Sequence, residues 1–146
     1  MTTDVLIDVK NLRKTFDNGA FVALSDVSAQ IHRGEVVVVI GPSGSGKSTF
    51  LRCLNLLEHP TGGQIIFDGV DITDPSVNIN IHRQRMGMVF QHFNLFPNMT
   101  ILRNMTLAPM KLLHKSRAEA EKKAMQLLER VGLADRANAY PSQLSG

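Results

Sequence analysis

Apolar residues in this sequence fall into short runs whose spacing predicts strands and helices in alternation. Residues 5–9 alternate with polar neighbours and predict a strand, and residues 21–31 are a second strand-like stretch after a turn at residues 17–19 (Asp-Asn-Gly). Residues 35–40 become continuously aliphatic after the first position, which is typical of a strand buried on both faces of a parallel sheet. Two shorter apolar runs, 64–67 and 86–90, are predicted to form further strands.

Other segments, between and after these runs, have apolar residues at the spacing of a helix. Residues 48–57 predict a helix that begins directly after a glycine-rich turn. Thr100 is predicted to cap a helix over residues 101–105, which Pro109 is expected to interrupt because proline lacks the backbone N–H that a helix needs.

The last predicted helix has the clearest start and stop signals. Ser116 and Glu119 have the spacing of a capping box, and Gly132 is a natural end. Between them one face collects the apolar residues Ala120, Ala124, Leu127, Leu128 and Val131. The elements together predict an α/β fold.

Composition excludes several classes of protein. The 146 residues are 43% hydrophobic and 20% charged, as in an ordinary folded domain. Sixteen Lys and Arg against thirteen Asp and Glu leave a net charge of +3, too little to indicate a nucleic-acid binder. The longest purely aliphatic stretch, 36–40, is far shorter than the roughly 20 residues of a membrane-spanning helix. The amino end lacks the pattern of a secretory signal, and the single Cys53 cannot form an internal disulfide, so we expect a cytosolic protein.

One motif carries specific chemistry. Residues 41–48 match the phosphate-binding pattern G-x-x-x-x-G-K-[ST] at every position, with a predicted strand before it and a predicted helix after it. The residues of this loop, with the threonine that follows it, are Gly41, Pro42, Ser43, Gly44, Ser45, Gly46, Lys47, Ser48 and Thr49.

Each residue type in the loop suits a nucleoside triphosphate. Gly44 and Gly46 allow tight backbone turns that direct N–H groups toward an anion. Lys47 reaches the β- and γ-phosphates, Ser48 offers a hydroxyl to Mg²⁺, and Thr49 offers another to the phosphates. The motif therefore predicts binding of ATP with Mg²⁺, although kinases, GTPases, helicases and transport ATPases share this loop.

Three further stretches make the family visible. They are Arg-Gly-Glu at 33–35, GMVFQHFNLFPNMT at 87–100, and YPSQLSG at 140–146. In this order, they resemble the nucleotide-binding domain of ABC transporters from about residue 5 to the last residue. Gln91 lies where that family has its Q-loop glutamine, and residues 144–146 resemble the first three residues of its LSGGQ signature.

The residues that flank these motifs narrow the resemblance to one group within the family. GPSGSGKSTFLRCLNLLE, then GMVFQHFNLFPNMT, then Ala-Pro at 108–109 resemble the ATPase subunits of bacterial polar amino-acid importers, the glutamine, histidine, glutamate and arginine group. Two alternatives stay open. One is an ABC ATPase that acts outside transport, in DNA repair, translation or cell division. The other is a nucleotide-binding fragment without catalysis.

The resemblance implies roles for particular residues. Lys47 and Gln91 would be catalytic, and Ser48 and Gln91 would hold the metal. Phe16 falls at the family's aromatic position that stacks on adenine, with packing in the core as the alternative. Ser145 and Gly146 would donate hydrogen bonds to the ATP of a partner subunit.

The resemblance also implies architecture and partners. We expect a P-loop NTPase core of the ABC type with an antiparallel β edge subdomain and the start of a helical subdomain. Residues 1–91 would form the ATP-binding core, with Walker A and the Q-loop, and 92–146 the helical subdomain, where the apolar loop 93–99 either docks a membrane subunit or packs internally. The partners would be membrane permease subunits, a solute-binding protein and a second copy of the full-length subunit, at the cytoplasmic side of the membrane, with no nucleic acid.

The family's remaining motifs have no counterpart in the sequence. Residues 144–146 are its last three, and no Walker B strand, catalytic glutamate or switch histidine follows them. We therefore expect an incomplete domain that is the amino-terminal portion of a longer ATPase. Such a chain is expected to bind ATP weakly without hydrolysing it, because no residue is a candidate to activate water.

Overall fold

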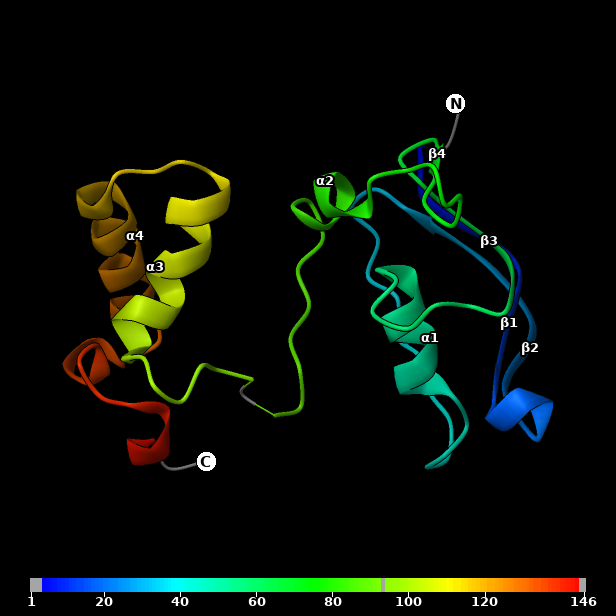
Figure 1. Cartoon of the computed structure of the whole chain (residues 1–146), viewed down its shortest axis with the longest axis horizontal. Coiled ribbons are helices and arrows are strands. Elements are labelled where there is room, and N and C mark those ends of the chain that lie inside the picture. The colour runs from blue at the N-terminus through cyan, green and yellow to red at the C-terminus, as the bar shows by residue number, and fades with distance from the viewer. Residues whose placement is uncertain (1–3, 93, 145–146) are drawn as a thin grey trace. The chain divides into compact units, whose positions relative to one another are not determined.

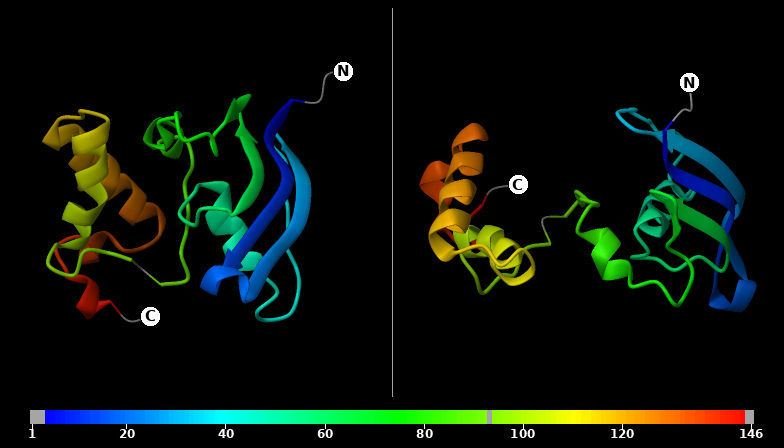
Figure 2. Two further views of the ribbon diagram at one scale, coloured as in Figure 1. Left: turned by 45° about the vertical axis from the view of Figure 1, so that its right-hand side comes forward. Right: turned by 90° about the horizontal axis from the view of Figure 1, so that it is seen from above.

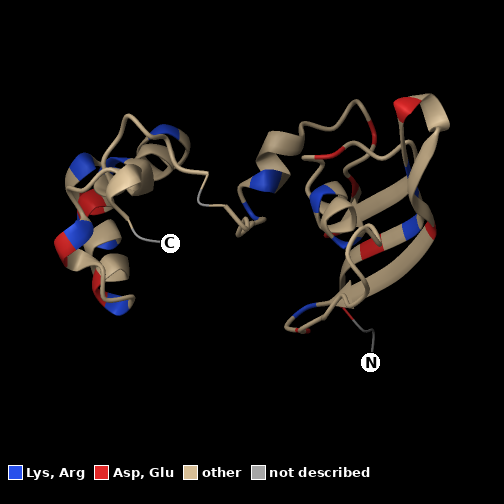
Figure 3. Cartoon of the chain, turned by 90° about the horizontal axis from the view of Figure 1, so that it is seen from below, with Lys and Arg blue, Asp and Glu red and all other residues tan. Residues whose placement is uncertain are grey.

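The computed structural model describes residues 4–92 and 94–144 (Figure 1). The chain forms two compact units, Met1–Met88 and Val89–Gly146. Lys and Arg residues and Asp and Glu residues occur on both units (Figure 3).

An antiparallel sheet forms the frame of the first unit. Its strands are ordered β2-β1-β3-β4, and β1 pairs with both neighbours, with register shifts in each ladder; Val9 faces Ala29 on one side and Ile65 on the other. The strands are β1 (Val5–Phe16), β2 (Phe21–His32), β3 (Gly62–Phe67) and β4 (Val70–Asp71). The short 3₁₀ turn Asp17–Gly19 joins β1 to β2, as the turn signal in the sequence predicted.

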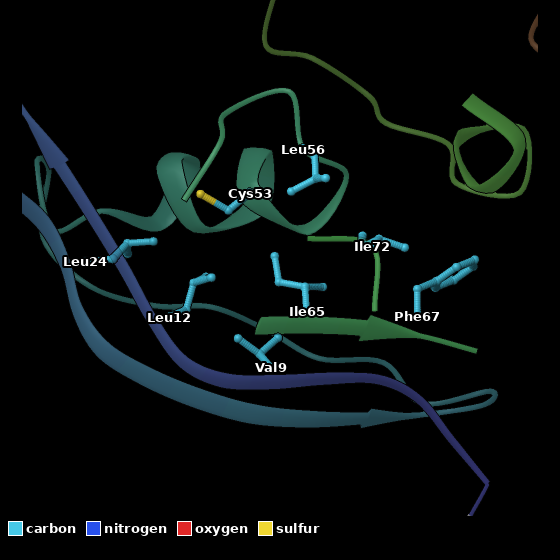
Figure 4. Packing of buried hydrophobic residues seen from close by; sticks show 8 residues of the cluster. All are labelled: Val9, Leu12, Leu24, Cys53, Leu56, Ile65, Phe67 and Ile72. Carbon is cyan, nitrogen blue, oxygen red and sulfur yellow. The ribbon is translucent and has the colours of Figure 1, made fainter. Parts of the chain in front are cut away.

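One face of this sheet packs against helix α1 (Lys47–Leu54), as both views of the unit show (Figure 2). Apolar side chains from the strands point toward the helix, where Cys53 is completely buried (Figure 4). The buried cluster consists of Val9, Leu12, Leu24, Cys53, Leu56, Ile65, Phe67 and Ile72. Arg83, in the short helix α2 (Ile79–Arg83), donates to the backbone oxygens of Asn55 and Leu56 at 3.0 and 2.8 Å and so caps the end of α1.

The predicted strands 35–40 and 86–90 do not form. Residues 36–40 are extended without ladder hydrogen bonds, and Val36 and Ile40 are 89% and 87% exposed. No strand in the described part of the chain lies beside this run, and a β-branched sequence without a partner strand has no backbone hydrogen bonds to hold it in a sheet. The same holds for 86–90, where Val89 is almost fully exposed.

Ion pairs fix the turn that precedes residues 36–40. Arg33 pairs with both Asp4 and Asp68, and Arg85 approaches the other oxygen of Asp68 at 2.7 Å. The hydrogen bond from Arg85, followed by the charge of Arg33, lowers the pKa of the Asp68 carboxyl. The end of β2 is therefore tied to the β3–β4 turn.

The second unit is a pair of helices with short 3₁₀ turns after them. Helix α3 (Ile101–Leu112) and helix α4 (Arg117–Arg130) pack around Ile101, Leu128 and Ala137. The 3₁₀ turns are Ala134–Arg136 and Pro141–Gln143. The predicted caps are confirmed: Thr100 accepts from the N–H of Arg103, and Ser116 and Glu119 form a complete capping box.

The prediction that Pro109 interrupts the helix is wrong. Helix α3 continues through it to Leu112, and the carbonyl of Pro109 accepts from the N–H groups of Leu113 and Lys115. Proline removes the one hydrogen bond that a residue at 109 would donate to the carbonyl of Met105, but the helix keeps its other bonds, and the Pro109 carbonyl helps to close its last turn. None of the helices within residues 4–92 and 94–144 is both long enough and apolar enough to cross a membrane.

Candidate nucleotide-binding site

The glycine-rich motif forms a hollow at the amino end of α1. A cavity of about 270 Å³ is lined by the backbone and side chains of residues 43–49, together with Phe21 and Ala23 of β2. The structure therefore brings seven of the predicted residues to one cavity: Ser43, Gly44, Ser45, Gly46, Lys47, Ser48 and Thr49. Helix α1 begins at Lys47, so its first N–H groups, which have no acceptor within the helix, lie at the same place.

Lys47 folds back over the loop from which it extends. Its Nζ donates to the carbonyl oxygens of Gly41 and Pro42 at 2.7 and 2.6 Å, and to Ser45 Oγ at 3.4 Å. Gly41 and Pro42 thus enter the site through their carbonyl groups. One ammonium group is held at the mouth of a loop whose geometry suits an anion.

Two glycines give the loop its shape. Gly44 and Gly46 have φ values of +80° and +90°, in the left-handed region that side chains disfavour. A Cβ on Gly46 would lie 2.5 Å from the carbonyl oxygen of Ala23, whereas a Cβ on Gly44 would meet no atom within 4 Å. Gly46 is therefore the point where the loop rests directly on the backbone of β2.

Two aromatic rings lie at the β1–β2 turn beside the loop. Phe16 and Phe21 face each other as the last pair of the β1–β2 ladder, with ring centroids 6.2 Å apart and planes inclined by 33°. Lys14 Nζ lies 4.7 Å from the centre of the Phe16 ring. The cavity is lined by Phe21 and not by Phe16, which the sequence had proposed as the adenine-stacking residue.

The remaining predicted residues lie elsewhere. Gln91 belongs to the second unit, where it is exposed in a bend after residues 86–90. Ser145 and Gly146 lie outside the described residues. Of the apolar loop 93–99, Leu95 packs against the core of the second unit while Phe96 is exposed, so both interpretations of that loop retain support.

The donors at the loop suit magnesium bound together with a phosphate. Ser48 lines the cavity with a hydroxyl oxygen, the kind of ligand that Mg²⁺ accepts while the phosphates and water supply the rest. Across residues 4–92 and 94–144, no group of three or more His, Cys, Asp or Glu residues is arranged to hold a metal ion. The residues thus fit a metal that arrives with a nucleotide better than a metal held by the protein alone.

Sequence reasoning missed Phe21 and Ala23. Both belong to β2, and only the pairing of β2 with β1 and the contact with Gly46 bring them to the loop. The one local signal was an aromatic residue close to the turn at 17–19, and such a residue alone does not indicate a ligand site.

Comparison with known proteins supports the resemblance. The model of the ABC transporter family matches residues 24–146. The glutamine transport ATP-binding protein GlnQ of Geobacillus stearothermophilus is 57% identical over 128 residues, which are 88% of this chain and 53% of the relative. The glutamate/aspartate import ATP-binding protein GltL of Escherichia coli is 49% identical over 141 residues, 97% of this chain and 58% of the relative.

Solved structures agree with the fold. The dimeric bacterial ABC transporter cassette MJ0796 superposes with a TM-score of 0.84 at 37% identity, covering 97% of this chain and 64% of that one. Its post-hydrolysis dimer bound to ADP and Pi gives a TM-score of 0.84 at 36% identity, covering 96% and 63%. The chain spans about half the length of the curated relatives it matches. The chain belongs to the ABC transporter family, with the fold of a P-loop ATPase cassette.

Proposed function

We propose that this chain is the ATP-binding part of the energy-coupling subunit of an ABC-type importer of amino acids. The observation that carries the proposal is the cavity at residues 43–49, with the Lys47 ammonium over its loop and the start of α1 beside it. The relatives matched by the chain are named as ATP-binding proteins for transport of glutamine, glutamate, aspartate or arginine. Transport coupling is thus an inference from these relatives, while triphosphate binding is supported by the site itself.

Different residues of the loop bind different parts of the triphosphate. Lys47 leaves the carbonyls of Gly41 and Pro42 and transfers its hydrogen bonds to phosphate oxygens, which are stronger acceptors because they are charged. The N–H groups at the start of α1 and the hydroxyl of Thr49 bind the remaining oxygens. Ser48 and Gln91 would hold Mg²⁺, which neutralises charge that develops during phosphoryl transfer.

Other assignments complete the proposal. Residues 1–91 form the ATP-binding core and residues 92–146 the helical subdomain. Phe16 contributes to the adenine subsite, and Ser145 and Gly146 bind the ATP of a second copy. In the full-length protein, two copies would close on ATP, reopen after hydrolysis, and act on membrane permease subunits at the cytoplasmic face, which receive solute from a binding protein.

Replacement of Lys47 by alanine tests the triphosphate site. Calorimetric titration of the purified variant with Mg·ATP should show an affinity for ATP at least tenfold lower than that of the parent chain, about 1.4 kcal/mol or more. The reason is that the variant lacks the ammonium group that would bind the phosphates. Lys115→Ala in the second unit is the matched control, since it removes one lysine that lies outside the loop. Equal ATP affinity in the Lys47→Ala and parent chains would refute the site.

A capture experiment tests the transport role. The tagged full-length protein, isolated from its own membranes in mild detergent, should retain permease subunits and should release phosphate from ATP. Retention of ribosomes or DNA in their place would assign it to the ABC ATPases that act outside transport.

A further inference from the structure

We infer that Phe21 is a second nucleoside-contacting ring, which makes the site prefer a nucleoside triphosphate to a bare polyphosphate. The inference rests on the proposed function and adds a residue to its adenine and ribose side. It starts from the position of Phe21, which lines the cavity at residues 43–49 although half of its surface, 52%, is exposed. An apolar ring that is exposed beside a phosphate-binding loop gains free energy when a ligand covers it.

The backbone holds this ring at the loop. Phe21 and Ala23 both line the cavity, Phe21 as the partner of Phe16 in the last pair of the ladder and Ala23 at the register shift between Val22 and Leu24. The carbonyl of Ala23 lies so near Gly46 that a Cβ there would stand only 2.5 Å from it. The backbone from which the Phe21 ring extends is therefore held beside the loop by a backbone contact two residues away.

The Phe16 ring already contacts two other side chains, Lys14 and Phe21. The Lys14 ammonium lies 4.7 Å from its ring centre, and this lysine is held in place by Glu58 and by the carbonyl of His59, to which it donates at 2.8 Å. Phe21 packs against Phe16 at 6.2 Å between centroids, inclined by 33°. The two rings form one apolar wall, of which Phe21 and not Phe16 lines the cavity at the loop.

This wall gives the site two chemically different ends. The loop binds phosphate oxygens through N–H groups and one ammonium, and it does so for any polyphosphate. The wall offers only apolar and aromatic surface, which a flat base or the carbon skeleton of ribose covers through dispersion and stacking. Loss of Phe21 should therefore weaken ATP binding while it leaves binding of inorganic tripolyphosphate unchanged.

The test compares these two probes on the purified 146-residue chain by calorimetry in the presence of Mg²⁺. Phe21→Ala should bind ATP about tenfold more weakly and tripolyphosphate as the parent does, in the range that stacking of one base on an aromatic ring gives. Val22→Ala is the matched control, because Val22 is equally exposed at 52%, follows Phe21 on β2 and does not line the cavity. It should leave both affinities unchanged.

The other possible results separate a failure of this inference from a failure of the proposed function. Equal ATP affinity in Phe21→Ala and parent would overturn the inference alone, and so would a parallel loss of both probes in a folded variant, since that would show a structural role. A parent chain that binds neither probe would overturn the proposed function as well. Should Phe21→Ala fail to fold, nuclear Overhauser contacts between adenine protons and the Phe21 ring in the parent decide: their presence supports the inference and their absence refutes it.

Discussion

Replacement of Gly46 by alanine measures how tightly the phosphate-binding loop rests on β2. Gly46 precedes the first residue of α1, has φ near +90°, and lies against the backbone of β2. The added Cβ would stand 2.5 Å from the carbonyl oxygen of Ala23 and 3.1 Å from a methyl group of Leu24. Ala23 lies at a register shift of β2, without a partner of its own on β1, but its neighbours Val22 and Leu24 are paired with Thr15 and Lys14, so its carbonyl cannot move far without disturbing these two pairs.

Two terms set the size of the effect. Alanine in the left-handed region costs about 1–2 kcal/mol, and forcing an extra carbon into a packed contact costs about 1–3 kcal/mol more. Gly44→Ala isolates the first term, because Gly44 also has a left-handed φ, +80°, but faces open space. We therefore expect a loss in free energy of unfolding of about 1–2 kcal/mol for Gly44→Ala and of about 2–5 kcal/mol for Gly46→Ala.

Urea unfolding of the two variants and the parent gives these free energies directly, provided that the slopes with denaturant agree. Calorimetric titration with Mg·ATP on the same samples shows whether the loop has moved instead, in which case Gly46→Ala loses affinity more than Gly44→Ala does. If the two variants match in both unfolding free energy and ATP affinity, the close contact between Gly46 and Ala23 plays no part in building the site.

Two further predictions concern stability. Ser116→Ala should lower the free energy of unfolding by about 1 kcal/mol, because Ser116 accepts from the N–H of Glu119 at the start of α4, and differential scanning calorimetry should show a lower Tm. Burial raises the pKa of the Cys53 thiol from an ordinary value of 9.0 to about 11. Above pH 9 the unfolded chain loses this proton while the folded chain keeps it, so the free energy of unfolding should fall as pH rises toward 11, by at most about 1.4 kcal/mol per pH unit. Cys53→Ala should lack that part of the slope, and an equal slope in both proteins would contradict the burial of the thiol.

Elements fixed by residues near one another in sequence could be predicted. The capping box at Ser116 and Glu119, the cap at Thr100 and the turn at 17–19 each depend on groups within a few residues, and all three form. The phosphate-binding loop belongs with them, since nine consecutive residues supply its glycines, its lysine and its hydroxyls. Local chemistry was sufficient for these features.

Strands required knowledge that the local pattern does not contain. Residues 36–40 have the strongest β propensity in the chain and form no strand, because a strand exists only when another lies beside it. The first strand, in contrast, runs to Phe16 although its alternation suggested an end at residue 9. A bulge explains this length: Asn11 has φ of +48°, its N–H donates to Ser28 Oγ at 2.9 Å, and its side chain donates to Asp26 at 2.6 Å.

The site shows the same division between local and distant contributions. Helix α1 and its loop supply all the residues that we propose bind phosphate, and the sequence motif contains all of them. Phe21 and Ala23, which border the cavity, come from β2, and their position depends on the ladder that pairs Phe16 with Phe21 and on the contact between Ala23 and Gly46. The antiparallel sheet therefore does more than cover the core beneath α1. On the inference drawn above, it also holds an apolar wall beside the phosphate-binding loop, an arrangement that suits ligands in which a flat or carbon-rich group is joined to a chain of phosphates.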